Sequence, residues 1–368
     1  MNPIAPFSRR QFLADASRLT ALSALAGAYP FAASSAIPDD PRVSQTPIAD
    51  AGYASVHKVG EGLYATISDP SKGFSTICNG GFLIGKETAL LLEGFGTPTG
   101  ARFQMEAFHK VTDVAAAGAL LTHYHFDHSF GSAFYGAHGI QLWAHANVSK
   151  RIFDSYVSMQ AADRAAFLAP LEKRATEAKS DLARQHARGY AATIGNIFDM
   201  AKKTSLALPN RPLDPDKLPL QVDLGHFPIV IEHYPGHSGT DLIVRVPEQK
   251  VVYTGDLLFS NAYPACFDDQ CTMSGWRNTL KTFASWDKDT LFIPGHGAVC
   301  GQQGVQNLRD VFDDFAEQAE KMHKAGVPVT DAVDQYIIPD KFKNFPVFDW
   351  GICISSAIAK LYADMGAK

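Results

Sequence analysis

Apolar residues occur in short runs early in the chain, and the spacing of these runs is typical of β-strands. Residues 63–68 alternate, residues 76–84 are apolar around an Asn-Gly-Gly turn, and residues 89–93 are almost fully apolar. A helical pattern follows at 101–111, and another apolar strand at 118–122. Because this last strand gives way directly to a polar loop, we expect side chains with chemical roles to follow it.

The later part of the chain repeats the order of strands followed by helices. A long polar stretch that favours helices, 147–220, comes first, and strand patterns return between 220 and 256. Helical patterns follow at 275–286, 305–324 and 353–365. Two successive halves of this kind predict an α/β fold in which two mixed β-sheets lie between helices. Because no flexible linker separates the halves, we expect one domain over 37–368.

Composition narrows the class of protein. The chain has 368 residues, of which 46% are hydrophobic and 19% are charged, so it can bury a large core and is not disordered. The formal net charge of −5 argues against a basic surface for nucleic acid or anionic lipid. No run of eighteen apolar residues occurs, so we expect no stable membrane insertion of the mature protein.

The first residues have the order of an export signal. Arg9 and Arg10 are adjacent, an Ala- and Leu-rich stretch follows at 19–33, and small residues occupy 32–36. This order is typical of a secretory signal, and the arginine pair resembles the twin-arginine type. We therefore expect residues 1–36 to be a cleaved twin-arginine-type signal peptide and the mature protein to lie in the periplasm. A cytosolic amphipathic helix with a chance arginine pair is the alternative.

The strongest chemical motif directly follows the strand at 118–122. It contains three histidines and one aspartate, namely His123, His125, Asp127 and His128. In an extended segment, alternation puts the first three on one side, and a turn can bring His128 to meet them. Packing four such polar side chains together without a metal would leave buried groups unpaired, so the motif predicts a metal site.

Three later segments each place a metal-binding side chain at a turn beside a strand. They are a Pro-Gly-His-Ser-Gly-Thr-Asp segment with His237, a Tyr-Thr-Gly-Asp segment with Asp256, and a Pro-Gly-His-Gly segment with His296. Nitrogen and oxygen ligands in such positions suit zinc. One loop cannot complete two metal spheres, so we expect these segments to contribute the remaining ligands.

These four motifs, in this order, resemble those of the metallo-β-lactamase superfamily, and the resemblance covers 55–300. It implies an αββα sandwich with the site at one edge of the two sheets, and it implies two Zn²⁺ ions per chain. Carried over position by position, the ligands of one zinc are His123, His125 and His237, the ligands of the other are Asp127, His128 and His296, and Asp256 bridges both.

The resemblance also implies a reaction. A hydroxide shared by two zinc ions attacks a carbonyl, phosphoryl or sulfuryl centre, and Asp127 acts as the catalytic residue that orients it and moves its proton. His125 stands where electron-transfer relatives with iron favour Glu, which indicates hydrolysis. No Cys is among the ligands, which departs from lactamases with a thiolate on the second zinc. Glu93 stands where an Asp is more usual.

Three hypotheses of function remain open at this stage. The first is an exported dinuclear zinc hydrolase that acts on a small-molecule ester, lactone, lactam or thioester. The second is hydrolysis of sulfate or phosphate esters on the same fold, which requires a cation near the metals, with Arg277 and Lys281 as candidates. The third is a zinc-bearing binding or relay protein that serves a partner enzyme.

The sequence also predicts roles for residues outside the ligand set. Ser260, Asn261 and Tyr263 follow Asp256 and are predicted to face the metals and bind substrate. The segment 147–220 exceeds what small relatives need, and we interpret it as a helical insertion that is a lid, an oligomer surface or a helical ornament.

The five cysteines leave one further question open. Cys266 and Cys271 lie close together in the sequence and form either a disulfide or two free thiols, with free thiols as the default. The remaining cysteines read as small buried hydrophobic residues.

Overall fold

Two β-sheets form the centre of the molecule. The computed structural model describes residues 37–366 apart from 39, 179–180 and 204, so the predicted signal peptide lies outside the described residues. Within this part of the chain, the first sheet contains eight strands in sequence order. These strands are β1 (Ala49–Asp50), β2 (Ala54–Gly60), β3 (Leu63–Ser68), β4 (Gly80–Ile84), β5 (Ala89–Leu92), β6 (Ala116–Leu120), β7 (Leu142–His145) and β8 (Arg211–Leu213).

The second sheet is built from the later half of the chain, and its five described strands lie in the order β13-β12-β11-β10-β9. These strands are β9 (Leu220–Asp223), β10 (Pro228–His233), β11 (Leu242–Val246), β12 (Val251–Ser260) and β13 (Leu291–Gly297). Both sheets are mixed, because hairpins pair antiparallel strands early in each sheet and crossovers give the parallel pairs β5–β6, β6–β7, β7–β8 and β12–β13.

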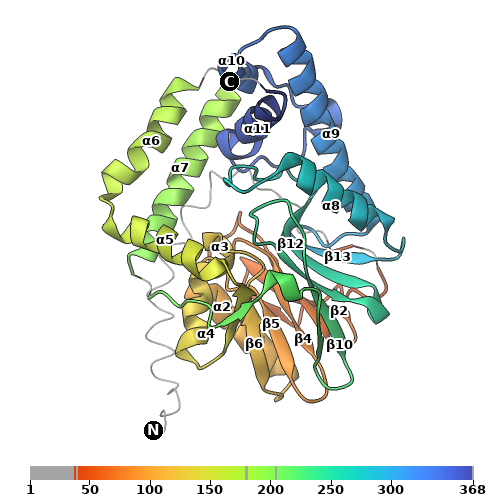
Figure 1. The fold of residues 1–368 in the computed structure, drawn as a ribbon. Helices are drawn as coiled ribbons and strands as arrows, with labels where there is room; N and C mark the ends of the chain where they lie inside the picture. Colours follow the sequence, from red (N-terminus) through yellow and green to blue (C-terminus); the bar gives the residue numbers. More distant parts are fainter. Residues whose placement is uncertain (1–36, 39, 179–180, 204, 367–368) are drawn as a thin grey trace.

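Helices cover the outer faces of both sheets and also form the upper part of the molecule in the view of Figure 1. The longer helices are α2 (Pro98–Val111), α5 (Val148–Ala161), α6 (Arg164–Glu177), α7 (Asp181–Ala201), α8 (Met273–Ser285), α9 (Gln302–Lys324) and α11 (Ser356–Asp364). Shorter helical elements are α3 (Phe126–Ser129), α4 (Ala133–Ala137), α10 (Val329–Gln335) and a π-helical turn, η6 (Gly351–Ser355).

Three apolar layers account for this arrangement. The layer between the sheets contains side chains such as Leu90 and Leu120 from the first sheet and Ile231 and Val244 from the second. A second layer packs α2 and α4 on the first sheet, and a third packs α8, α9 and α11 on the second. Burial on both faces explains why β5 is apolar throughout and why every residue of β12 is buried. The predicted fold of two mixed sheets flanked by helices is therefore confirmed.

The far ends of the strands, opposite the ligand motifs, are closed by short turns. The turn from β4 to β5 contains the exposed Lys86 and Glu87, and the turn from β11 to β12 contains Pro247–Gln249 (η4). The amides of Lys86 and Glu87 donate to carbonyls of Gly225 and Leu224 in the β9–β10 turn. These turns therefore link the two sheets at the end away from the ligand motifs.

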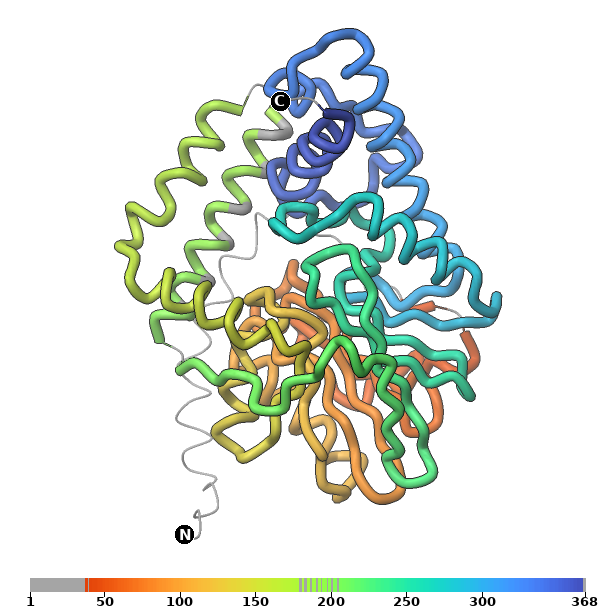
Figure 2. Tube along the Cα trace, viewed as in Figure 1, coloured from red at the N-terminus to blue at the C-terminus, as the bar shows by residue number. Residues whose placement is uncertain are grey.

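The sequence-predicted segment 147–220 contains helices α5, α6 and α7 and strand β8, and β9 begins at its last residue. Figure 2 shows α6 and α7 at the same end of the molecule as the C-terminal helices, and the guanidinium of Arg174 in α6 lies 3.1 Å from the carboxylate of Asp349. The apolar cluster around Leu168 and Ile194 includes Ile77, which precedes β4. The segment thus packs against both the first sheet and the C-terminal part of the chain.

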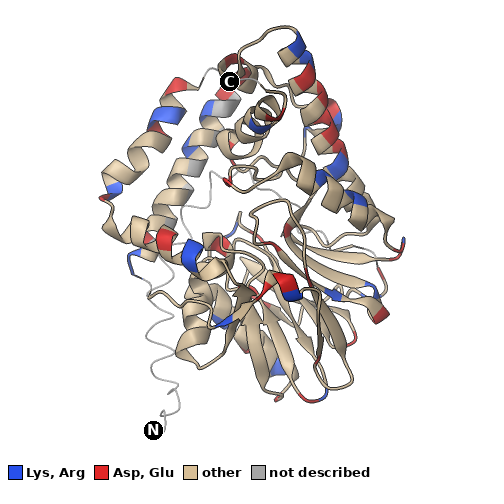
Figure 3. Cartoon of the chain, viewed as in Figure 1, with Lys and Arg blue, Asp and Glu red and all other residues tan. Residues whose placement is uncertain are grey.

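Charged residues of both signs are mixed on the outer helices, as Figure 3 shows for α9. None of the helices among the described residues is long and apolar enough to cross a membrane.

The main departure from the predicted elements concerns β12. The sequence places Asp256 at the end of a strand, whereas β12 continues to Ser260. The strand can continue because β13 pairs beside it in parallel, with register shifts on either side of Gly255. Asp256 therefore projects from an irregular part of a buried strand.

Candidate metal centre

The first four predicted ligands lie where β6 ends and a short helix begins. His123 and His125 are in the extended loop, and Asp127 and His128 are in the turn of α3. The helical turn brings His128 back beside the others, and the ring centroids of His123 and His128 lie 4.2 Å apart. All four side chains are buried.

The other three ligands come from the second sheet. His237 is in the loop from β10 to β11, Asp256 is in β12, and His296 is near the end of β13. The β12 backbone approaches the first loop so closely that a Cβ on Gly255 would lie 2.5 Å from the Thr122 hydroxyl. A glycine with φ of +50° permits this approach. The structure therefore brings all seven predicted ligands to one edge of the two sheets.

Three histidines and one aspartate form the first group of ligand atoms. Nδ1 of His125 lies 3.0 Å from Nε2 of His123 and 2.9 Å from Nε2 of His237. Oδ2 of Asp256 lies 3.3 Å from Nε2 of His237. A tetrahedral zinc with bonds of about 2.1 Å separates its ligand atoms by roughly 3.4 Å, so a modest expansion of this group would accommodate one.

Asp127, His128 and His296 form the second group. Nε2 of His296 lies 3.2 Å from Oδ2 of Asp127, and Nε2 of His128 lies 3.1 Å from Oδ1 of Asp256. Asp256 thus turns one carboxylate oxygen to each group, the arrangement that a bridging ligand requires. His296 is the most open of the seven, with 16% of its side chain exposed.

Hydrogen bonds on the outer side of the first group determine which ring nitrogens face inward without a proton. Nδ1 of His237 lies 3.0 Å from the carbonyl of Ala265, and Nε2 of His125 lies 3.1 Å from Oδ2 of Asp268. Each acceptor requires the proton on the nitrogen that faces it. The opposite nitrogens then meet inside the group as bare lone pairs, which repel one another unless a cation lies between them.

Buried polar atoms without hydrogen-bond partners also fit a cation-binding site. Both ring nitrogens of His128 and Oδ1 of Asp256 are in this state. Burial lowers the pKa of His237 to about 3, and burial together with the charges of its histidine neighbours lowers the pKa of His123. Burial alone would raise the pKa of Asp256, but His296 and His128 hold it well below its usual range. In the first group, neutral imidazoles beside an ionised carboxylate are the state in which metals bind. In the second group, burial would lower the pKa of His296, but Asp256 and Asp127 raise it to about 9, so a metal that binds there displaces a proton.

Glu93 supports the ligand loop from behind. Its carboxylate accepts a hydrogen bond of 2.5 Å from the hydroxyl of Thr122, and that hydroxyl lies 3.1 Å from Nδ1 of His123. The same carboxylate lies 3.1 Å from Nδ1 of His128. The longer Glu side chain therefore contacts one ligand from each group, directly or through Thr122.

Asp241 shapes the loop that carries His237. Its carboxylate accepts hydrogen bonds from the backbone amides of His237 and Ser238, at 2.9 and 2.8 Å, and from the Ser238 hydroxyl at 2.6 Å. The sequence contains this residue in the quoted Pro-Gly-His segment, but sequence analysis assigned it no role. Its spacing of four residues from a ligand is typical of a carboxylate that closes a turn.

Asn79 links the first sheet to the turn that carries His296. Its side-chain amide donates to the carbonyls of Pro294 and Gly297, at 3.0 and 2.7 Å, and its backbone amide donates to Gly295. Its side-chain oxygen accepts from the amide of Ser68. The turn is therefore fixed on both sides of the ligand.

Sequence analysis missed Asp268, whose side chain is fully buried beside His125. This residue lies in the irregular stretch between β12 and α8, where no strand or helix pattern indicates which way a side chain points. It is separated from His125 by 143 positions in the chain. Only the folded structure brings the two together.

The predicted substrate-binding residues lie elsewhere. The hydroxyl of Ser260 is buried near Cys300 and Gly304. Asn261 is exposed and pairs with Asn307 of α9 at 2.6 Å, and the hydroxyl of Tyr263 lies 3.2 Å from that of Tyr336. These three side chains contact the helical layer over the second sheet and do not face the metals, because the chain turns toward α9 where β12 ends.

Other candidate side chains are also placed by the structure. Arg277 pairs with Asp313 of α9 at 2.5 Å, and Lys281 is exposed on α8, so neither supplies the predicted cation beside the metals. Cys266 and Cys271 are both free thiols and both buried, which agrees with the default expectation and not with a disulfide.

An aromatic ring also lies beside His125. The ring of Phe267 stacks on the imidazole of His125 with centroids 4.9 Å apart, and 43% of Phe267 is exposed. Phe126, between two ligands, belongs to the apolar cluster that α6 and α7 complete. A separate cavity of about 610 Å³ is lined by residues of α6 and of the C-terminal helices, including Arg174 and Trp350, and by none of the seven ligands.

Comparison with known proteins gives a family match and two structural similarities. The family model of the Metallo-beta-lactamase superfamily matches residues 76–296, which contain all seven ligands. Among solved structures, TMB-1, studied for substrate and inhibitor binding, is 13% identical with a TM-score of 0.48, and the DIM-1 metallo-beta-lactamase is 13% identical with a TM-score of 0.49. Each alignment covers 71% of this chain and 97% of the other. No curated protein matches the chain.

Proposed function

Because the chain belongs to the metallo-β-lactamase superfamily and is a metal-dependent hydrolase, we propose that it is an exported dinuclear zinc enzyme that cleaves a small-molecule ester, lactone, lactam or thioester. The observation that carries this proposal is the pair of ligand groups joined by Asp256, whose two oxygens face different groups. A site with one metal would leave one of these groups of buried polar atoms unpaired.

The ligand set fits zinc. Histidine nitrogens and carboxylate oxygens are borderline and hard ligands, and each group can supply at least three of them to a four-coordinate ion. Two zinc ions in this site would lower the pKa of water toward neutrality and polarise the bond that is cleaved.

Asp127 is the residue placed to handle the proton. Its carboxylate lies in the more open of the two groups, 3.2 Å from His296. Burial raises its pKa, but the neighbouring His128 and His296 outweigh burial and hold the pKa below its ordinary value. The ionised carboxylate can accept the proton of an attacking water and hold it until the leaving group departs.

The exposed aromatic ring beside His125 favours a neutral carbonyl substrate. The exposed face of Phe267 offers an apolar contact directly beside His125. Sulfate or phosphate esters would require a cation to balance their charge, and Arg277 and Lys281 do not provide one at the metals. Two alternatives remain for the assays to distinguish from hydrolysis of a carbonyl substrate. One is hydrolysis of sulfate or phosphate esters, and the other is a relay role for a partner enzyme.

The first test measures metal content and hydrolysis together. We expect purified protein to hold two zinc ions per chain by elemental analysis. A screen should cover nitrocefin, lactones, thioesters, p-nitrophenyl esters and sulfate esters. For the best substrate, Asp127→Asn is expected to lower kcat by about a hundredfold or more, because general-base catalysis contributes 10²–10⁴.

A matched control is Asp113→Asn, which changes an exposed carboxylate beyond the end of α2 and should leave kcat unchanged. Hydrolysis of every active substrate at the wild-type rate by Asp127→Asn would contradict the proposed role of this residue. Turnover of sulfate esters alone would favour the second hypothesis, and the absence of turnover without an added protein would favour the relay.

We also propose the cellular setting that the sequence predicts, a periplasmic protein released from a twin-arginine-type signal at 1–36. We propose that its substrate is a small molecule and that it does not bind nucleic acid. The helical segment 147–220 is proposed as an insertion. Its surface is also a candidate contact between copies of the chain, and light scattering would detect such an oligomer.

A further inference from the structure

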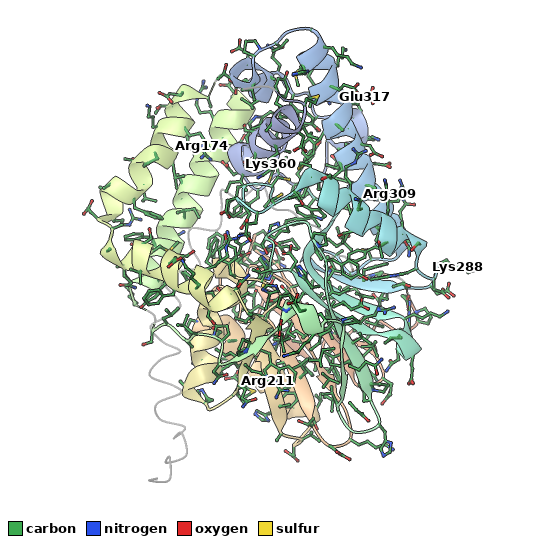
Figure 4. All side chains as sticks on the ribbon, in the orientation of Figure 1. Arg174, Arg211, Lys288, Arg309, Glu317 and Lys360 are labelled. Atoms are coloured by element: carbon green, nitrogen blue, oxygen red, sulfur yellow. The ribbon has the colours of Figure 1, made fainter. Side chains whose placement is uncertain are left out.

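A buried carboxylate beside the first metal group is contacted from several parts of the chain. Oδ2 of Asp268 lies 3.1 Å from Nε2 of His125 and accepts a hydrogen bond of 2.6 Å from the hydroxyl of Tyr124. Oδ1 accepts from the backbone amide of Gln270 at 2.7 Å. Lys360 of α11, labelled in Figure 4, donates to the backbone carbonyl of Asp268 at 2.8 Å. Asp268 is therefore held at one position relative to His125.

Among the described residues of the helical segment 147–220, one cation reaches this carboxylate. Nη2 of Arg151 in α5 lies 3.2 Å from Oδ2 of Asp268 and donates to the hydroxyl of Tyr124 at 2.9 Å. The guanidinium lies over the Tyr124 ring, 4.2 Å from its centroid, and also pairs with the exposed Asp269. Only 17% of the Arg151 side chain is exposed.

The contact between Arg151 and Asp268 compensates a buried negative charge. The Asp268 side chain is fully buried, and a buried carboxylate is costly unless a positive charge and hydrogen bonds compensate it. Arg151 supplies that charge and also holds the hydroxyl of Tyr124 that donates to the same oxygen. Without Arg151, Asp268 would lose its charged partner, and the charge of the acceptor that faces the imidazole of His125 would no longer be compensated.

We infer that Arg151 is a positioning residue of the metal centre, which acts through Asp268 to fix the ring of His125 with Nδ1 directed at the metal. This inference rests on the proposed metal centre and extends it to the helical segment. It assigns α5 a specific task, namely supply of the charge that keeps a ligand in the orientation for binding. Partners that orient metal-binding histidines typically contribute 10–100-fold to metal affinity.

The test compares metal binding by the full chain with and without this cation. Zinc affinity is measured by competition with a chromophoric chelator, and the coordination is followed by the absorption spectrum of the Co²⁺-substituted protein. Arg151→Gln is expected to lower one of the two stepwise zinc affinities by about 10–100-fold and to change the Co²⁺ spectrum. Arg151→Lys should lose less, because it keeps the charge but not the planar group that reaches both partners.

Two further variants separate positioning from a general structural effect. Lys150→Gln changes the neighbouring, largely exposed cation of α5 and should leave both affinities and the spectrum unchanged. Asp268→Asn keeps the size of the carboxylate but removes its charge, and should reproduce the affinity loss, so it provides the readout if Arg151→Gln does not fold.

The outcomes are distinct for the two proposals. Wild-type zinc affinities and an unchanged Co²⁺ spectrum in Arg151→Gln or, if that variant does not fold, in Asp268→Asn, would overturn the positioning role and leave the proposed function intact. A wild-type chain that binds no zinc would overturn both. Loss of affinity in Lys150→Gln equal to that in Arg151→Gln would assign the effect to α5 as a whole and also overturn the inference.

Discussion

Burial and neighbouring charges determine the protonation state of individual histidines in this protein. His145, which lies outside the metal cluster, is a clear case. It ends β7, is 3% exposed, and its ring lies 5.0 Å from that of His233. Its Nδ1 accepts a hydrogen bond from the amide of Asn147. Strand β7 extends to this residue and buries it. The buried ring is therefore held neutral.

This burial predicts a pH dependence of stability. Burial, and then the charge of His233, lowers the pKa of His145 to about 4 from an unfolded value near 6.5. Between pH 4 and pH 6.5 the unfolded state binds more protons at His145 than the folded state does. The contribution of the neutral His145 to the free energy of unfolding is therefore complete above pH 6.5 and is lost as the pH falls to 4.

The measurement compares urea unfolding of wild type and His145→Gln between pH 4 and pH 7. The variant should show a shallower decline of the free energy of unfolding toward acid, since one proton-binding site is removed. Parallel curves for the two proteins would contradict the assignment. Replacement of the exposed His138 by Gln serves as the control.

At the scale of elements, the parallel pair β12–β13 sets the position of Asp256. A Cβ on Gly295 would lie 2.0 Å from Oδ1 of Asp256 and 2.9 Å from its backbone nitrogen. The strands can approach this closely only because residue 295 has no side chain. The bridging ligand therefore depends on a glycine in the neighbouring strand.

We expect Gly295→Ala to destabilise the protein by about 1–3 kcal/mol, because the added methyl group forces the strands apart. It should also lower metal content, because Oδ1 of Asp256 must move. Gly301→Ala adds a Cβ in open space and should cost no more than about 1 kcal/mol as a change at the start of α9. Elemental analysis and thermal unfolding of both variants check this, and a fully loaded Gly295→Ala protein would contradict it.

At the scale of elements, part of the structure could be predicted from the sequence and part could not. The ligands could be identified because each lies in a short motif beside an apolar strand. The bounds of β3 agree with the predicted strand at 63–68 because its pattern is regular. Ser260 and Asn261 could not be placed, because the direction of the chain after a strand depends on the helix that packs there. Arg151 carries no motif, since it acts on residues that are distant in sequence.

At the scale of the whole molecule, the metal centre joins the two halves of the chain. Four ligands come from the loop after β6 in the first sheet and three from the second sheet. Metal bound at this edge therefore contributes to the association of the sheets as well as to chemistry.

Removal of metal should lower the stability of the protein. A ligand that binds only the folded state adds about 2.7 kcal/mol at a free concentration one hundred times its dissociation constant. Thermal unfolding with and without a chelator is expected to show a lower Tm for the apo protein, restored by added zinc. An unchanged Tm after verified metal loss would show that the sheets associate equally well without the ions.

The proposed export is a second property to test at the scale of the whole chain. We expect Arg9→Lys combined with Arg10→Lys to prevent delivery of the protein to the periplasm, because the twin-arginine signal depends on this pair. Cell fractionation and the mass of the mature N-terminus provide the measurement, with Arg18→Lys as the control. Periplasmic protein at the wild-type level in the double variant would contradict this type of signal.

The turns that close the strands opposite the metal centre have a practical consequence. The exposed turn at Lys86 and Glu87 and the turn before Lys250 lie at the end of the sheets away from all seven ligands. A fluorescent dye, an affinity tag or a surface anchor attached there would leave the catalytic edge open. The enzyme could therefore be immobilised in a defined orientation, with the reacting edge directed toward the solution.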